Sequence, residues 1–190
     1  NPILLHGDPA YLSKLKMLPR VDRERMLGGN WNVRNTAGSY FKREQFIKIK
    51  AAPPCVAEVR YWDCAATEKR GDGSNQSATA GVRMGLTSDG TAVVMHVFRD
   101  FLTASGVDKA MRVTAASDGQ GVEVWIEQEP GGSGKARGQD QVRKLGGFIA
   151  RMNPVHESKG ARASIFAAQV QAGNVLIVEG PWNDAYFREL

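Results

Sequence analysis

A change of hydrophobic periodicity near residue 56 constrains the fold of this 190-residue chain more than any other sequence feature. From that point, three runs rich in valine and aromatic residues follow one another, at residues 56–63, 79–84 and 91–98. Segments containing glycine and serine separate the runs, and residues 87–90 (TSDG) suit a hairpin turn. Because valine and aromatic residues favour strands, the pattern predicts a meander of three consecutive antiparallel strands.

After the meander, the pattern alternates between helix and strand. Strands are expected at 122–127 (VEVWIE) and 175–178, and helices at 105–117, at 135–149, after Pro154 and within 181–190. The residues expected to face the core from the first three helices are Val107, Met111 and either Val113 or Ala115; Val142, Leu145 and Ile149; and Ala163, Phe166, Ala167 and Val170. This order predicts an α/β fold with a sheet of mixed strand direction, and the ribonuclease H-like fold has this order of elements.

The first 52 residues differ from the rest of the chain. Residues 8–27 predict two short charged helices separated by Pro19, and the glycines that follow end the second helix. The next segment is aromatic and basic and is interpreted as an irregular arm, with a boundary at Pro53-Pro54. We therefore expect a linker arm over residues 1–52 and the main domain over residues 53–190. Because the first residue is not methionine, we also expect a piece of a longer protein.

Composition narrows the class of protein. Hydrophobic residues make up 42% of the chain, which is enough for a core, and no apolar run is long enough to span a bilayer. No basic start followed by an apolar stretch indicates a secretory signal. The formal net charge of +5 fits a polyanionic partner without requiring one. Cys55 and Cys64 flank one predicted strand, which cannot fold back to join them, and are expected to be reduced thiols of a cytosolic protein.

Two acidic residues end two of the predicted strands. Asp63 closes the first strand and Glu127 closes the fourth. If these strands are neighbours, the two carboxylates converge at the rim of the sheet, where they repel unless a cation lies between them. Such oxygen ligands suit one or two Mg²⁺ or Mn²⁺ ions. Glu129, in the following Pro-Gly-Gly loop, is an alternative or additional ligand. The structural alternative is that each acid only caps a turn at a strand end.

Basic residues near these acids are candidates for contacts to DNA phosphates. The segment EPGGSGKA (129–136) is not a P-loop, since Glu129 and Ala136 replace a required glycine and a required Ser or Thr, but Lys135 opens a helix there. The predicted DNA contacts are Lys135, Arg137, Arg143, Lys144, Lys159 and Arg162, with Arg151 adding positive charge nearby. A solvated basic face is the alternative for each of them. His96 is expected to be packed within its strand, and His156 to lie in a loop near the basic segment.

Four segments resemble the nuclease region of the large terminase subunit of tailed bacteriophages. In chain order they are VRYWDCAATE (59–68), TAGVRMG (79–85), VWIEQEPGGSGK (124–135) and FAAQVQAGNVLIVEGPWND (166–184). The earlier segment LPRVDRERMLGGNWNVR (18–34) is similar to the part that joins this region to the motor ATPase. The resemblance covers nearly the whole chain, and the combination in this order is specific.

The resemblance implies a ribonuclease H-like, metal-dependent endonuclease that cuts concatemeric double-stranded DNA when packaging begins and ends. Asp63 and Glu127 match acids that the family uses. A third family Asp follows the segment matching Phe187–Leu190, so the site is expected to be completed beyond Leu190. Many relatives carry an acid close to the position of Ser77, and no ligand is assigned there. ATP hydrolysis is not expected of this piece.

The resemblance also implies partners and a location. The expected partners are phage DNA, the portal, the small terminase subunit and copies of the chain in the packaging motor, without a membrane. The expected location is the host bacterial cytoplasm and, transiently, the procapsid portal. Two alternatives stay open: a junction resolvase or transposase-type nuclease of the same fold, and a non-catalytic module that docks on DNA or the portal.

Overall fold

A computed structural model of the chain describes residues 26, 29, 40–65, 77–128 and 131–190. One mixed sheet runs through it in the order β1-β7-β4-β3-β2-β5-β6. The strands are β1 (Ile47–Ile49), β2 (Ala57–Asp63), β3 (Thr79–Leu86), β4 (Ala92–Asp100), β5 (Glu123–Gln128), β6 (Ala150–Pro154) and β7 (Val175–Val178). The helices are α4 (Ala104–Asp118), α5 (Gly132–Lys144), α6 (Lys159–Gln171) and α7 (Asn183–Glu189), and a 3-10 turn, η1 (Arg43–Gln45), precedes β1.

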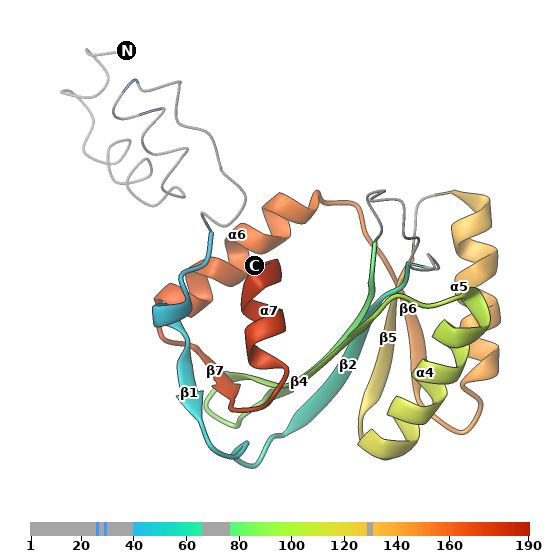
Figure 1. Ribbon diagram of the computed structural model, residues 1–190, viewed down its shortest axis with the longest axis horizontal. Coiled ribbons are helices and arrows are strands. Elements are labelled where there is room, and N and C mark those ends of the chain that lie inside the picture. The colour runs from blue at the N-terminus through green and yellow to red at the C-terminus, as the bar shows by residue number, and fades with distance from the viewer. Residues whose placement is uncertain (1–25, 27–28, 30–39, 66–76, 129–130) are drawn as a thin grey trace.

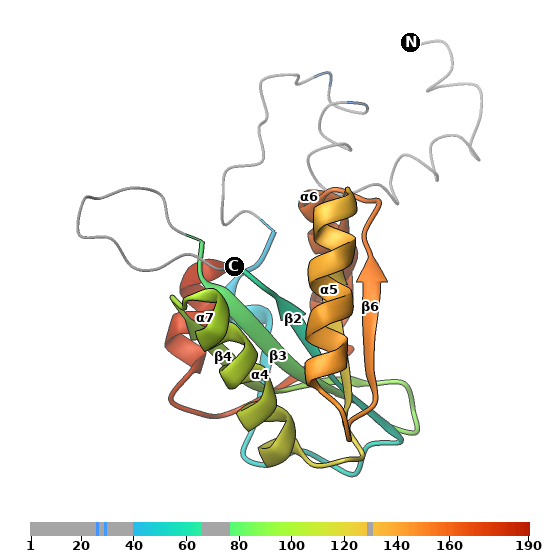
Figure 2. The same ribbon diagram turned by 90° about the vertical axis from the view of Figure 1, so that its right-hand side faces the viewer.

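Within this sheet, β3 is antiparallel to both of its neighbours and every other pair of adjacent strands is parallel. The predicted meander of β2, β3 and β4 and the mixed α/β sheet are therefore confirmed. Figure 1 views the sheet nearly edge-on, with α4 and α5 on one side and α6 and α7 on the other. Figure 2 turns the α4–α5 side toward the viewer and shows α5 running beside the edge strand β6.

Each face of the sheet has its own apolar core. On the α4–α5 side, Trp62, Val124 and Ile126 of the sheet pack with Val107 and Met111 of α4. The core on the other side contains Phe46, Val94, Val170, Val175 and Ile177, with aromatic residues of α7 packed against it. In α4, the buried residues are Val107, Met111 and Ala115, whereas Val113 is exposed, which decides between the two predicted alternatives.

Strand β2 presents different chemistry to the two faces because successive side chains of a strand point to opposite sides. Trp62 and Cys64 point into the α4–α5 core, and Tyr61 and Asp63 point to the other side. Gly81 of β3 pairs with Trp62, and a side chain there would collide with the indole, since a Cβ atom would lie 2.8 Å from its ring carbons. Both cysteines are free, as predicted, and burial raises the pKa of Cys64 to about 12.

A buried ionic group also lies on the α4–α5 face. The guanidinium of Arg60 in β2 donates to Asp118 at the end of α4 through two bonds of 2.7 and 2.8 Å, and the two side chains are 2% and 6% exposed. Arg60 Nη1 also donates to the Gly81 carbonyl and lies 3.1 Å from His96 Nδ1. Arg83 also belongs to this group, since its Nη1 atom lies 3.3 Å from Asp118 Oδ1. The expected packing of His96 is confirmed only in part: its ring lies beside Arg60 and 6.2 Å from the Trp182 ring, but the residue is exposed.

Strand β4 contains a bulge. Arg83 pairs with His96, but the next residue, Met84, pairs with Val94, so Met95 is an extra residue in β4. The extra residue changes the alternation. Val94 and Val97 both contact the α7 side although they are three positions apart.

The sequence interpretation was wrong about two strands. The helix expected at 135–149 ends at Lys144, and Ala150–Pro154 forms strand β6. Gly147, at φ 97°, reverses the chain between them, and Ile149 is exposed rather than on the core face. Likewise, β1 lies within the segment interpreted as an irregular arm, and it pairs in parallel with β7.

Several predictions concern residues outside the described part of the chain. They are the two helices within 8–27, most of the arm, and Glu129. The division between residues 52 and 53 stays a prediction, although β1, which precedes it, belongs to the sheet. No helix in the described part is both long and apolar enough to cross a membrane.

Candidate functional site

Asp63 and Glu127 lie side by side at one rim of the sheet. Strands β2 and β5 are parallel neighbours, paired up to Trp62 and Ile126, and each acid is the next residue. Since Trp62 and Ile126 are buried on the α4–α5 side, both carboxylates point to the opposite face. The convergence expected from the sequence is thus what the strand pairing produces.

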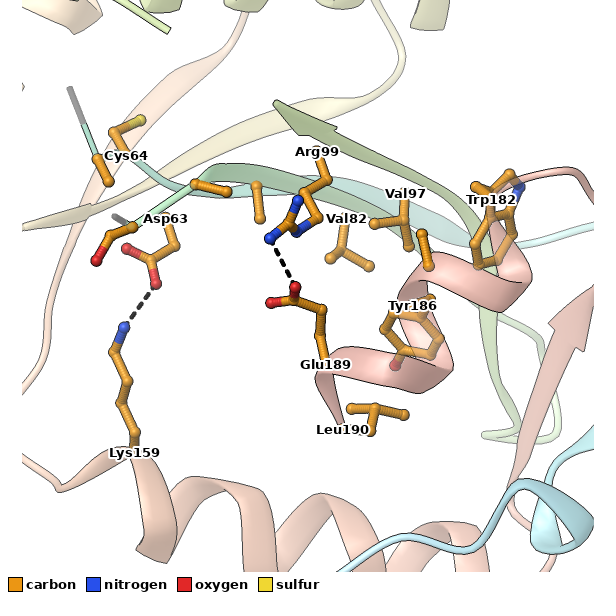
Figure 3. Close-up of a pocket in the computed structure, with 15 residues that line it drawn as sticks. Asp63, Cys64, Val82, Val97, Arg99, Lys159, Trp182, Tyr186, Glu189 and Leu190 are labelled. Carbon is orange, nitrogen blue, oxygen red and sulfur yellow. Dashed lines mark hydrogen bonds and ion pairs between the residues drawn. The ribbon is translucent and has the colours of Figure 1, made fainter. Parts of the chain in front are cut away.

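The first turn of α6 brings two cations onto these acids. The Ser158 hydroxyl accepts from the Ala161 amide and begins the helix. Lys159 Nζ lies 2.7 Å from Asp63 Oδ2, a pair that Figure 3 shows spanning from α6 to the end of β2. Arg162 forms a two-bond pair with Glu127, with Nη1 3.0 Å from Oε2 and Nη2 3.2 Å from Oε1.

The two ion pairs differ in exposure. The side chains of Lys159 and Asp63 are 75% and 48% exposed, whereas those of Arg162 and Glu127 are 33% and 15% exposed. The hydrogen bond to Asp63 raises the pKa of Lys159, and the bonds to Glu127 raise the pKa of Arg162. Both basic groups are therefore cations at neutral pH, and they balance the two carboxylates charge for charge.

A second contact reaches Glu127 from within the sheet. The Tyr61 hydroxyl donates to Glu127 Oε2 at 3.3 Å, and Asn153 Nδ2 of β6 donates to the Tyr61 oxygen at 3.0 Å. Burial is the main cause of a raised pKa of Tyr61, so its hydroxyl keeps its proton at neutral pH.

A groove of about 810 Å³ opens beside Asp63, between the sheet and the helices α6 and α7. The small apolar side chains of Ala80, Val82 and Val97 form its floor. Trp182, just before α7, and Tyr186 within α7 line one side. Arg99 of β4 and Glu189 of α7 form an ion pair of 2.6 Å across it, as Figure 3 shows. Ser77, where many relatives are expected to carry an acid, also lines this groove.

The other predicted DNA contacts are divided between the two ends of α5. Lys135 is exposed in its first turn, and Arg137 lines a small cavity with Glu127, with its Nη2 atom buried and without a partner among the described residues. Arg143 and Lys144 are at the other end, roughly 12 to 14 Å from Lys135 along the helix axis. There Lys144 pairs with Asp108 and Asp140.

Two further basic or titratable residues lie near this face. Arg151 of β6 is 3.8 Å from Glu123 and stands over the ring of Trp125. His156 is exposed between β6 and α6. Of the predicted DNA contacts, Lys159 and Arg162 thus form ion pairs with Asp63 and Glu127. The other basic residues form no ion pair with these two acids among the described residues.

The donor set fits a hard divalent cation. Two carboxylates on adjacent strand ends provide oxygen ligands, and Asp63 is open to solvent. Among the described residues, no three His, Cys, Asp or Glu side chains gather at one metal site. The described part of the site therefore has two carboxylates, and their role as ligands, like that of Glu129 and of any acid after Leu190, stays a prediction.

Tyr61 and Asn153 are the contacts that sequence reasoning missed. Tyr61 stands two residues before Asp63, so strand alternation alone places both on one face. Asn153 carried no such indication, because its strand was not expected.

Comparison with known proteins adds an independent observation. The family profile of the terminase RNaseH-like domain matches residues 60–190, more than half of the chain. The chain belongs to this family. No curated protein has a significant sequence match to this terminase domain.

Solved structures show the same fold. The nuclease domain of the P22 large terminase is 16% identical, with a TM-score of 0.52 over 78% of this chain and 75% of that one. The large terminase of a thermophilic bacteriophage in complex with ADP is 12% identical, with a TM-score of 0.61 over 93% of this chain. The terminase domain spans 42% of that longer protein. The large terminase nuclease of the thermophilic phage G20c with bound zinc is 15% identical, with a TM-score of 0.48 over 77% of this chain and 84% of that one.

Proposed function

We propose that this terminase domain is a divalent-metal-dependent endonuclease that cuts concatemeric double-stranded phage DNA at the start and end of packaging. The observation that carries the proposal is the position of Asp63 and Glu127 on neighbouring parallel strands, on one face and at one rim. Family membership supports the packaging role. The portal, the small terminase subunit and further copies of the chain are the partners we propose, in the host cytoplasm and at the procapsid portal.

In this proposal, Asp63 and Glu127 hold one or two Mg²⁺ or Mn²⁺ ions. A bound ion of this kind activates water and stabilises the leaving oxygen of a phosphodiester. An acid beyond Leu190 is proposed to complete the ligand set.

The two cations of α6 have a role that follows from charge balance. Lys159 and Arg162 neutralise the two carboxylates. With a divalent cation bound at the carboxylates, the Lys159 and Arg162 side chains would no longer be needed to balance their charge and would be available to a phosphodiester. Both stand on α6 next to the acids, where they hold the DNA backbone through charge rather than through base contacts.

Substitution of the acids by their amides tests the proposal. Asp63→Asn and Glu127→Gln keep the shape and remove the ligand charge, so we expect each to weaken Mn²⁺ binding and to slow nicking of supercoiled plasmid by at least about 100-fold. Mn²⁺ binding is measured by electron paramagnetic resonance of the free ion, and nicking by gel.

Glu123→Gln is the matched control, because Glu123 stands on β5 with Glu127 but contacts Trp125 and Arg151 instead. Nicking by Asp63→Asn at the wild-type rate would contradict the proposal. Binding of DNA without an ion and without cleavage would favour the non-catalytic docking alternative. Preferential cutting at four-way junctions would favour a resolvase.

A further inference from the structure

Three side chains form a hydrogen-bonded chain across three adjacent strands. Asn153 in β6, Tyr61 in β2 and Glu127 in β5, the strand between them, are linked by bonds of 3.0 and 3.3 Å. An ionised carboxylate only accepts hydrogen bonds, so the Tyr61 proton points to Glu127. The phenolic oxygen must then accept from Asn153. Both hydrogen bonds are therefore donated in one direction, from Asn153 to Tyr61 and from Tyr61 to Glu127.

These hydrogen bonds connect Glu127 to the strand of the other candidate ligand, Asp63. Tyr61 and Asp63 stand on the same strand and the same face, roughly 7 Å apart along it. The Tyr61 hydroxyl therefore ties the end of the Glu127 side chain to the strand that carries Asp63. Among the described residues, Arg162 of α6 is the only other hydrogen-bond donor to the Glu127 carboxylate.

The two donors to Glu127 respond differently to an incoming cation. Arg162 is charged and competes with a metal ion for the carboxylate. Tyr61 is neutral, and it occupies Oε2 only, while Oε1 accepts a bond from Arg162 alone among the described residues. If a cation displaced Arg162, Tyr61 would be the described donor able to stay on Glu127.

We propose that Tyr61 is a positioning residue of the carboxylate pair, and that Asn153 acts on the pair through Tyr61. The hydroxyl holds Oε2 of Glu127 and would leave Oε1 available as a metal ligand. This inference rests on the proposed function, since it assigns a role to Tyr61 at that same site.

The decisive variant is Tyr61→Phe, which removes only the hydroxyl. We expect the Kd for Mn²⁺ to rise on the order of tenfold, the effect typical of a lost partner behind a metal ligand. Asn153→Ala should give a smaller rise. If Asn153 acts through Tyr61, the double variant should bind Mn²⁺ no more weakly than Tyr61→Phe, within about twofold.

Trp125→Phe is the matched control. It removes one hydrogen bond to a carboxylate, Trp125 Nε1 to Glu123 at 2.9 Å, on the strand that carries Glu127. Its Mn²⁺ affinity should equal that of the wild type. Thermal unfolding of all variants, measured without metal, separates a loss of stability from a loss of affinity.

The outcomes are distinguishable. A lower melting temperature of Tyr61→Phe with unchanged Mn²⁺ affinity gives Tyr61 a structural role only and overturns the inference, while the proposed function stands. Additive effects of Tyr61→Phe and Asn153→Ala overturn the linkage between them. Wild-type Mn²⁺ affinity in both Asp63→Asn and Glu127→Gln defeats the proposed function and this inference together.

Discussion

Strand β2 carries an ionic group on each of its faces, and the two groups are built differently. On the α4–α5 face, Arg60 and Asp118 are almost fully buried and make two short bonds, with further acceptors for the same guanidinium. On the opposite face, the pairs Lys159–Asp63 and Arg162–Glu127 join a helix end to a sheet rim and are open to solvent to different degrees.

The difference separates a contact that holds the fold from contacts that can be exchanged. A buried ion pair leaves an uncompensated charge in a poorly solvated place when one partner is lost, and this is strongly destabilising. An exposed pair contributes little to stability, because solvent screens it and can take over either partner. The rim pairs therefore suit a site where ions and phosphates come and go.

Removal of Asp118 should give the largest effect on stability. Asp118→Ala leaves the Arg60 guanidinium buried without its anion, and we expect a loss of about 3–5 kcal/mol in the free energy of unfolding. Urea denaturation measures it. Asp184→Ala, which removes the exposed ion pair with Arg43, is the control and should cost less than about 1 kcal/mol. Equal losses in the two variants would erase the distinction between the faces.

Removal of a rim cation should change affinity as well as stability. In Arg162→Gln we expect the unfolding free energy to fall by about 1–2 kcal/mol, less than in Asp118→Ala, because the Arg162–Glu127 pair is partly exposed. Because Arg162 competes for Glu127, the Kd for Mn²⁺ should fall by roughly three- to tenfold, while binding to DNA weakens. Lys144→Gln, at the far end of α5, should leave the Mn²⁺ affinity unchanged. Weaker Mn²⁺ binding by Arg162→Gln would mean that this cation supports the site rather than occupying it.

The smallest expected effect concerns pH and His96. Desolvation and the neighbouring Arg60 and Arg83 lower the pKa of His96, while Asp118 raises it, and the net shift is downward. The unfolded chain therefore binds the proton more readily than the folded one, so His96 costs stability as the pH falls from 7 through 6.5 toward the folded pKa. The melting temperature of His96→Gln should fall less between pH 7 and pH 5.5 than that of the wild type. An identical pH dependence in both proteins would show that His96 does not sense the Arg60 group.

The sequence predicted the positions of the acids better than it predicted their partners. Asp63 and Glu127 could be placed because alternation determines the face to which a strand residue points, and because a residue at the end of a strand lies at the rim of the sheet. Lys159 and Arg162 are three residues apart and so share a helix face, but which surface they meet depends on how α6 docks.

The spacing of Val142, Leu145 and Ile149 favoured one long helix, although Gly146-Gly147 interrupts it. Strand β6, with the polar residues Arg151 and Asn153, is an edge strand with one neighbour and lacks the apolar alternation that identifies inner strands.

Strand β4 contains a bulge, whereas strand β2 contains none where it pairs with β3. Strand β4 accommodates Met95 as an additional residue and still sends Val97 and Phe98 to their proper sides. Strand β2 pairs without interruption with β3 along its whole length, so one inserted residue after Arg60 would turn Asp63 toward Met111 and Trp62 into the groove. Arg60, which pairs with the buried Asp118, and Asp63, at the rim, thus reach opposite faces of the sheet only with their present spacing along β2. The bulge shows that β4 accommodates one extra residue, whereas an insertion or deletion between Arg60 and Asp63 would turn one of them to the wrong face of the sheet.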